Sequence, residues 1–241
     1  MRIAIVSDIH GNLTALEAVI ADLRQTAPDL ILHGGDLVQN GAIPAEVIDR
    51  IRDLGWPGIL GNTDEMLFRP EALTEFASHS PQLEHLFAMI AEIAEFTRQA
   101  LGEERLEWLR SLPLTQIVAP VALVHASPGD LWRAPMPDAS DADLERVYRP
   151  LGQPVAVYAH IHRPYIRRLP GLTVANTGSV SLSHDGDPRA SYLLIDEGVP
   201  SIRRVAYDLD REAALLDASG IPHAGWLIEN LKSGSFQMPR P

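Results

Sequence analysis

The side chains best suited to catalysis in this 241-residue sequence are of types that bind metal ions, and they follow short apolar runs. Aspartate, histidine and asparagine recur after five such runs, and the chain contains no cysteine. The residues concerned are Asp8, His10, Asp36, Asn62, His125, His160 and His162. Imidazole, carboxylate and amide donors without sulfur suit Mn, Fe, Zn or Ni and do not choose among them. The lack of cysteine also excludes a thiol nucleophile, a thiolate metal site and a disulfide framework.

The order of these residues along the chain explains how distant positions could meet. The apolar runs at 3–6, 30–32, 58–60, 121–124 and 155–158 are each predicted as a buried strand. Ligands of open α/β sheets bind just beyond the carboxyl ends of strands. Taken singly, a strand-end aspartate is more often a helix N-cap, and a His-x-His pair can lie on an exposed edge strand. The complete set at successive strand ends favours a metal site.

The same residues stand in motifs that resemble the calcineurin-like metallophosphoesterase superfamily. These motifs are Asp8-Ile-His10-Gly11-Asn12, Gly35-Asp36, Gly61-Asn62-Thr63-Asp64, His125 and His160-Ile-His162. Two further segments are similar to its small prokaryotic phosphodiesterase branch, namely Asn176-Thr-Gly178-Ser179 and Asp185-Gly-Asp187-Pro-Arg189-Ala-Ser191-Tyr192. The resemblance covers residues 1–64 and 115–205. It implies an α/β fold, a four-layer αββα sandwich of two mixed β-sheets.

The resemblance also implies a centre of two divalent transition metal ions. The implied ligands of the first ion are Asp8, His10 and His162, those of the second are Asn62, His125 and His160, and the implied bridge is Asp36. The implied catalytic residues are Asp8, His10, Asp36 and Asn62. Two ions roughly 3.5–4 Å apart can clamp a phosphoryl group, generate hydroxide from bound water and neutralise the leaving oxygen.

The activity that the resemblance implies is hydrolysis of phosphoester bonds by metal-activated hydroxide. Thr63 departs from the family pattern, because many relatives carry a histidine there that donates a proton or a hydrogen bond to the scissile phosphate. The absence of this histidine favours phosphodiesters or nucleotide-type small molecules as substrates. Two alternatives stay open: a phosphomonoesterase or protein phosphatase, and a regulatory module that binds metal without catalysis.

Four further residues are candidates for binding the substrate: Asn12, Thr63, Arg163 and Trp132. Arg163, next to the His-x-His pair, is an equally good candidate for a structural ion pair. Trp132 could stack on a nucleobase or pack against its own domain. Of the remaining histidines, His33 is expected in the core and His184 at the surface.

The chain is expected to form a single domain over 1–241, with a helical, cap-like insertion at about 65–112 and a C-terminal helical extension at about 209–241. Helices are expected at 12–25 and 44–54, between the first strands. The later strands are expected at 114–118, 165–168, 172–175, 191–196 and 201–207. Their crowding favours mixed sheets over a purely parallel one.

The insertion itself is expected to be helical. Ser80 as N-cap and Pro81 predict a helix over 81–101, and Leu106 and Leu109 a short helix after it. A packing elaboration and a cap over the substrate are equally good interpretations of this segment.

The net charge and the hydropathy of the sequence limit the kinds of binding partner and the cellular location that are expected. With 20 basic and 32 acidic side chains, the net charge of −12 argues against nonspecific binding to nucleic acid or to anionic membranes. Two divalent ions would outweigh the carboxylates of Asp8 and Asp36, so the crevice would still attract a small phosphoester. No apolar stretch is long enough for a signal peptide or a spanning helix, so a cytoplasmic location is expected. The sequence leaves the oligomeric state open.

Overall fold

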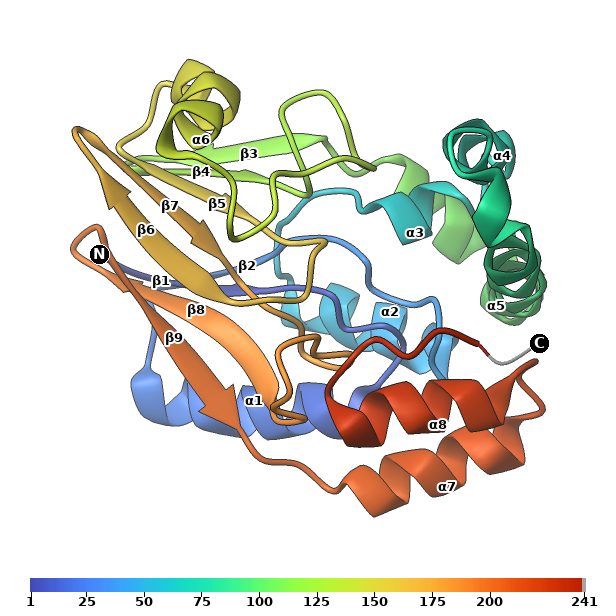
Figure 1. Ribbon diagram of the computed structural model, residues 1–241. Helices are drawn as coiled ribbons and strands as arrows, with labels where there is room; N and C mark the ends of the chain where they lie inside the picture. The colour runs from blue at the N-terminus through green and yellow to red at the C-terminus, as the bar shows by residue number, and fades with distance from the viewer. Residues whose placement is uncertain (240–241) are drawn as a thin grey trace.

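Two mixed β-sheets form the centre of the protein in this computed structural model, which describes residues 1–239 (Figure 1). The first sheet has the order β2-β1-β8-β9 and consists of β1 (Arg2–Val6), β2 (Leu30–His33), β8 (Ala190–Asp196) and β9 (Val199–Val205). The second has the order β3-β4-β5-β7-β6 and consists of β3 (Thr115–Val118), β4 (Val121–Val124), β5 (Val155–Tyr158), β6 (Tyr165–Leu169) and β7 (Leu172–Asn176). Each sheet contains parallel and antiparallel pairs.

Alternate residues of the central strands face two different cores, which is why these strands are continuous apolar runs. Ile3 and Ile5 of β1 lie in the core between the sheets, together with Val157 of β5. Ala4 and Val6 of β1 lie in the core that the first sheet shares with helices. Because successive side chains of a strand point to opposite faces, one buried strand contributes to both cores.

Helices cover the outer faces of both sheets. α1 (Leu13–Thr26) and α2 (Pro44–Leu54) pack against the first sheet. α6 (Asp141–Tyr148), followed by the 3₁₀ turn η2 (Arg149–Leu151), packs against the second. Figure 1 shows α1 and α6 on opposite sides of the paired sheets. The predicted α/β fold, a four-layer αββα sandwich of two mixed sheets, is therefore confirmed.

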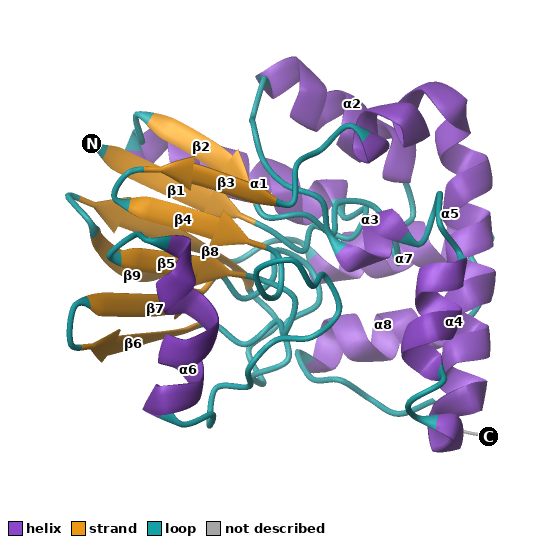
Figure 2. Cartoon of the chain, turned by 90° about the horizontal axis from the view of Figure 1, so that it is seen from above, coloured by secondary structure: helices purple, strands orange, loops and turns teal. Residues whose placement is uncertain are grey.

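The remaining helices gather beyond one end of the sheets, as Figure 2 shows. Those between β2 and β3 are α3 (Asn62–Glu65), α4 (Glu71–Ala77), η1 (Pro81–Leu83) and α5 (Glu84–Arg110). The C-terminal pair consists of α7 (Leu209–Ser219) and α8 (Ala224–Ser233). Residues 240–241 of the expected extension lie outside the described residues. Across residues 1–239, none of the helices has the length and apolar character needed to cross a membrane.

One predicted strand is wrong. The segment 58–60 meets β2 only in an isolated bridge between Gly58 and His33. Pro57, just before it, has no N–H to donate to a ladder. The N–H of Leu60 then donates to the carbonyl of Pro113 at 2.9 Å, so the segment turns away from β2. It still delivers Asn62 to the end of the sheet, because the backbone has already passed alongside β2.

The insertion differs in detail from the sequence prediction. The helix expected from residue 81 begins as the turn η1, and the side chain of Ser80 makes no capping hydrogen bond. The expected break before Leu106 lies at Gly102, whose φ of 72° and ψ of 167° interrupt α5. The short helices α3 and α4 were not predicted, because two turns or fewer leave little periodicity in a sequence.

Candidate metal centre

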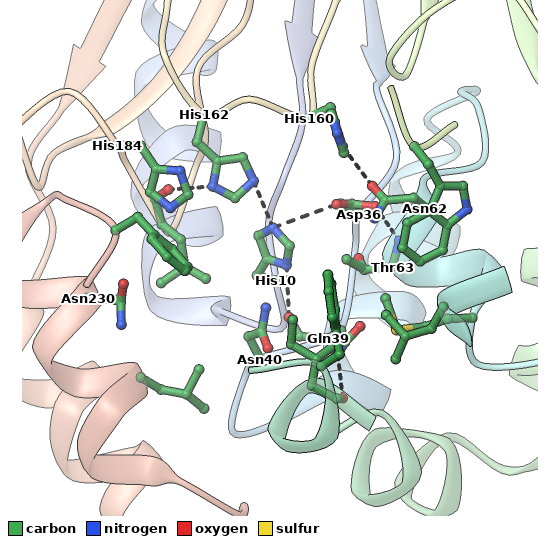
Figure 3. Close-up of a pocket in the computed structure, with 18 of the residues that line it drawn as sticks. His10, Asp36, Gln39, Asn40, Asn62, Thr63, His160, His162, His184 and Asn230 are labelled. Atoms are coloured by element: carbon green, nitrogen blue, oxygen red, sulfur yellow. Dashed lines mark hydrogen bonds and ion pairs between the residues drawn. The ribbon is translucent and has the colours of Figure 1, made fainter. Parts of the chain in front are cut away.

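Four of the predicted donors form one buried group where β1, β2 and β5 end. Three of them, His10, Asp36 and His162, are labelled in Figure 3. Asp8, His10, Asp36 and His162 offer ligand atoms that lie within 4.8 Å of one another. Nε2 of His10 is 3.1 Å from Nε2 of His162, which is 3.2 Å from Oδ1 of Asp8. Two nitrogens bound to one ion at about 2.0–2.1 Å would be roughly 3.3 Å apart in tetrahedral geometry. The group therefore has the spacing that a metal ion requires.

The other three predicted donors meet beside this group. Oδ1 of Asn62 lies 2.9 Å from Nε2 of His125 and 2.9 Å from Nδ1 of His160. Oδ1 of Asp36 lies 3.4 Å from Nε2 of His125, while its Oδ2 lies 3.9 Å from Nε2 of His10. All seven donors are thus brought together, and Asp36 stands between the two groups.

Backbone carbonyls orient the imidazoles. Nδ1 of His10 lies 2.9 Å from the carbonyl of Gln39, and Nδ1 of His162 lies 2.5 Å from that of Leu182. When Nδ1–H donates to these carbonyls, the lone pairs of both Nε2 atoms face each other, an arrangement that suits a bound cation. Burial lowers the pKa of His162, but Asp8 outweighs this and raises it.

The donor loops continue the pairing of β1 with β2 beyond the strands. The N–H groups of Asp8 and His10 donate to the carbonyls of Gly35 and Asp36, at 3.0 and 3.1 Å. Of the nine non-glycine residues with positive φ among residues 1–239, five are predicted donors: Asp8, His10, Asp36, His160 and His162. Left-handed backbone is costly for such residues and clusters at functional sites. The inter-loop hydrogen bonds hold the donors in it.

Burial and mutual charge set the protonation of the group. Burial raises the pKa of Asp36, but the neighbouring His125 outweighs this and holds it well below its usual range. Burial lowers the pKa of His125, but Asp36 raises it to about 9. For His10 and His160, burial and the adjacent imidazoles lower the pKa to about 4. Two imidazoles are therefore neutral at pH 7 and ready to bind metal, and a metal ion would displace the proton of His125.

Asp64 is a positioning residue, a role that the sequence did not predict. Its fully buried carboxylate accepts hydrogen bonds from the N–H of Leu37 at 2.9 Å and of Gly61 at 3.3 Å. It therefore ties the loop of Asp36 to the loop of Asn62. Gly61 is required by close approach, because a Cβ there would lie 2.1 Å from Oδ1 of Asp36. The only sequence signal was the Gly-Asn-Thr-Asp motif itself.

A cavity of about 200 Å³ opens onto the donor group. His10, Asp36, Asn62, His160 and His162 lie on one side of it (Figure 3). Apolar side chains from α4, α5 and α8 form much of the rest. The sequence left open whether the insertion covers the substrate or only packs, and α4 and α5 of the insertion do line the cavity. The contribution of α8 was not predicted, because an apolar face lining a cavity has the same periodicity as one buried in a core.

The four substrate-binding candidates separate into two pairs. Thr63 and Trp132 line the cavity. Asn12 caps α1 by accepting from the N–H of Ala15 at 2.8 Å, and it is not among the lining residues. Arg163 is exposed and also outside the lining, and its Nε donates to the carbonyl of His184 at 3.1 Å.

His184 corrects another expectation. It was expected at the surface, but its half-buried ring lies 4.5 Å from the ring of His162 and lines the cavity. The loop after β7 folds back toward the donors, and the N–H of His184 donates to the carbonyl of His162 at 3.0 Å. His33 is buried as expected.

Comparison with known proteins assigns the class. Residues 1–198 match the calcineurin-like phosphoesterase superfamily domain, and the chain belongs to this superfamily. The resemblance inferred from the sequence is therefore confirmed. The chain is a phosphoesterase, a hydrolase of a metal-dependent family.

Individual relatives agree with this class over different lengths. An uncharacterized protein of Methanocaldococcus jannaschii is 30% identical over 257 residues, which cover 96% of this chain and 98% of that protein. The crystal structure of a metallophosphoesterase from Sphaerobacter thermophilus has a TM-score of 0.78 at 28% identity, and the match covers 97% of this chain and 100% of that one. A symmetrical bis(5'-nucleosyl)-tetraphosphatase of Methylococcus capsulatus is 29% identical over 150 residues, 61% of this chain and 50% of that enzyme.

Proposed function

We propose that this chain hydrolyses phosphoester bonds of small substrates with two divalent metal ions at the carboxyl ends of its strands. The ligands would be Asp8, His10 and His162 for one ion, and Asn62, His125 and His160 for the other, with Asp36 as the bridge. One observation carries the proposal: the two carboxylate oxygens of Asp36 approach the two donor groups separately, at 3.9 Å from His10 and 3.4 Å from His125.

The donor chemistry fits ions of this kind. Carboxylate, imidazole and amide oxygen suit Mn, Fe, Zn or Ni. When bound, such a pair activates water and neutralises charge on the phosphoryl group and the leaving oxygen. The residues of the chain hold the donors in place. The carbonyls of Gln39 and Leu182 orient the imidazoles of His10 and His162. Asp64 ties the loop of Asp36 to the loop of Asn62.

Phosphodiesters or nucleotide-type substrates are favoured over monoesters. Thr63 lines the cavity and stands where many relatives carry a histidine, and a threonine hydroxyl is not an acid at neutral pH. Substrates whose leaving group is itself a stabilised phosphate or nucleotide need less of this help. The name of the tetraphosphatase relative describes a substrate of that kind.

The alternatives are separated by one assay. Hydrolysis of an aryl phosphodiester and the matching aryl monoester is measured with added Mn, Fe, Zn or Ni, and with a chelator as control. We expect chelator-sensitive activity with a preference for the diester. A preference for the monoester would indicate a phosphomonoesterase. Metal binding with no turnover of either ester would indicate a regulatory module.

A further inference from the structure

The cavity over the metal centre has two chemically different halves. We propose that it takes phosphoesters that carry, besides the leaving group, one compact, uncharged aromatic group, and this inference rests on the proposed hydrolysis at the metal centre. The phosphate would lie against the donor group, and the aromatic group against the wall formed by α4, α5 and α8. The insertion and the C-terminal extension would then shape specificity rather than only pack against the sandwich.

The aromatic rings that line the cavity form two clusters. In one, the ring of Phe76 lies 5.2 Å from that of Trp132 and 6.0 Å, edge to face, from that of Phe87. In the other, the ring of Phe236 lies 6.2 Å from that of Trp226. All five line the cavity. A flat aromatic group in the cavity would pack against these rings, since aromatic pairs attract at such distances.

The polar atoms beside these rings are engaged within the protein. Nε1 of Trp132 donates to Glu65 at 2.7 Å, and Nε1 of Trp226 donates to the carbonyl of Gln237 at 2.7 Å. The side chain of Asn230 on α8 donates to the carbonyl of Trp226 and accepts from the N–H of Gln237. The amide oxygens of the lining that have no partner among residues 1–239 belong instead to Gln39 and Asn40, in the loop after β2, and both are buried. The helical wall therefore offers mainly apolar surface to a ligand.

Cations to receive a second phosphate are missing from the cavity. No lysine or arginine is among the residues within 1–239 that line it. Arg133 lies over the outer ring face of Phe76, at 5.6 Å, but it is paired with Asp130 and is outside the lining. A polyphosphate chain would have to place buried negative charge against apolar side chains, which is costly without partners. At about 200 Å³, the cavity also suits a single ring system better than two nucleosides.

The test keeps the leaving group constant, so that chemistry does not vary with binding. The metal-loaded enzyme is assayed on phenyl, methyl and 4-sulfophenyl p-nitrophenyl phosphate. We expect kcat/KM for the phenyl ester to exceed that for the methyl ester by about 10–100-fold, from burial of the ring. The sulfonated ester, of the same shape but with an added charge, should fall at least about 10-fold below the phenyl ester.

A variant locates the effect. Phe87→Ala should lower kcat/KM for the phenyl ester about 10-fold more than for the methyl ester. Ile117→Ala, at a 53% exposed position on β3, is the matched control and should change neither. Turnover with equal rates on phenyl and methyl esters, or a faster sulfonated ester, would overturn the inference while leaving the phosphoesterase function intact.

Binding gives a readout that does not depend on turnover. Calorimetric titration with the non-hydrolysable phenylphosphonate and methylphosphonate should show about 10-fold or more tighter binding of the phenyl compound. If no ester is hydrolysed with any metal, the proposed function fails, and this comparison still decides the inference. Equal affinities would overturn it.

Discussion

The side chain of Thr63 shows how one residue separates substrate classes at this site. Its buried hydroxyl has no hydrogen-bond partner among the described residues, whereas its N–H donates to Oδ1 of Asp36 at 2.9 Å. The backbone of this residue therefore supports the donor group, and its side chain is free to vary. A change of the side chain should alter proton donation without disturbing the metal ligands.

Thr63→His should raise monoesterase activity relative to diesterase activity. An imidazole at this position can protonate the leaving oxygen, and such assistance is typically worth about 10²–10⁴-fold. The measurement is kcat/KM for one matched diester and monoester in both proteins. Thr63→Val, which removes the hydroxyl at similar size, is the control and should leave the ratio unchanged. A wild-type enzyme that already strongly prefers alkyl monoesters would show that the proton comes from elsewhere.

At the scale of elements, a partly buried carboxylate links the first helix to the first sheet. Asp22 of α1 accepts hydrogen bonds from the hydroxyl of Tyr192 on β8 at 2.6 Å and from Arg203 on β9 at 2.9 Å. Burial raises the pKa of Asp22, but these two partners outweigh it and lower the pKa below its ordinary value. The contact thus links α1, which follows the first donor loop, to two strands distant in sequence.

Asp22→Asn should lower the free energy of unfolding at pH 7 by about 1–2 kcal/mol, because Arg203 is partly exposed and its interaction is screened. The folded pKa is depressed, so this stability is present above the unfolded pKa of about 3.9 and is lost as pH falls through the folded pKa. Urea unfolding of both proteins at several pH values measures this loss of stability. Asp138→Asn, at an exposed position in a loop, is the control. A difference that persists unchanged at low pH would contradict the assignment.

The break in α5 depends on one glycine. Gly102 has a φ of 72° and a ψ of 167°, a region open essentially to glycine alone, and a Cβ there would meet nothing within 4 Å. Gly102→Ala should therefore destabilise by about 1–3 kcal/mol through backbone strain rather than steric overlap. Gly225→Ala in α8, also with free space around a Cβ, should be neutral or stabilise by about 0.5–1 kcal/mol. Equal effects in urea unfolding would contradict this account.

At the scale of the whole molecule, the hydrophobic pattern of the sequence predicted most strands, and the residues that follow those strands predicted where the candidate site lies. Continuous apolar runs such as Ile3–Val6 predicted strands correctly because the two faces of a central strand are buried in two different cores. The predicted donors that follow strands lie together because the parallel pairs β1–β2 and β4–β5, one in each sheet, deliver the loops that follow them to the same place. The prediction of a strand at 58–60 was wrong because its apolar run resembles a strand, whereas the N–H of Leu60 donates to the carbonyl of Pro113 and not to a neighbouring strand.

The cavity wall lay beyond sequence reasoning. Phe76 and Phe87 lie in the neighbouring helices α4 and α5, whereas Trp226 lies in α8 near the other end of the chain, and only the packing of these helices brings the three side chains to one cavity. Nothing in a single sequence distinguishes an apolar helix face that lines a cavity from one that fills a core. The position of His184 was missed for a similar reason, because it depends on a loop that folds back onto His162.

The central claim is a pair of metal ions that share Asp36, and metal stoichiometry tests it most directly. Wild-type protein and Asp36→Asn are dialysed to equilibrium against increasing Mn²⁺, and bound metal per chain is measured. We predict saturation at two ions per chain for the wild type, and weakened binding at both sites in the variant, since one carboxylate contacts both donor groups. Saturation of the wild type at one ion per chain would contradict the account.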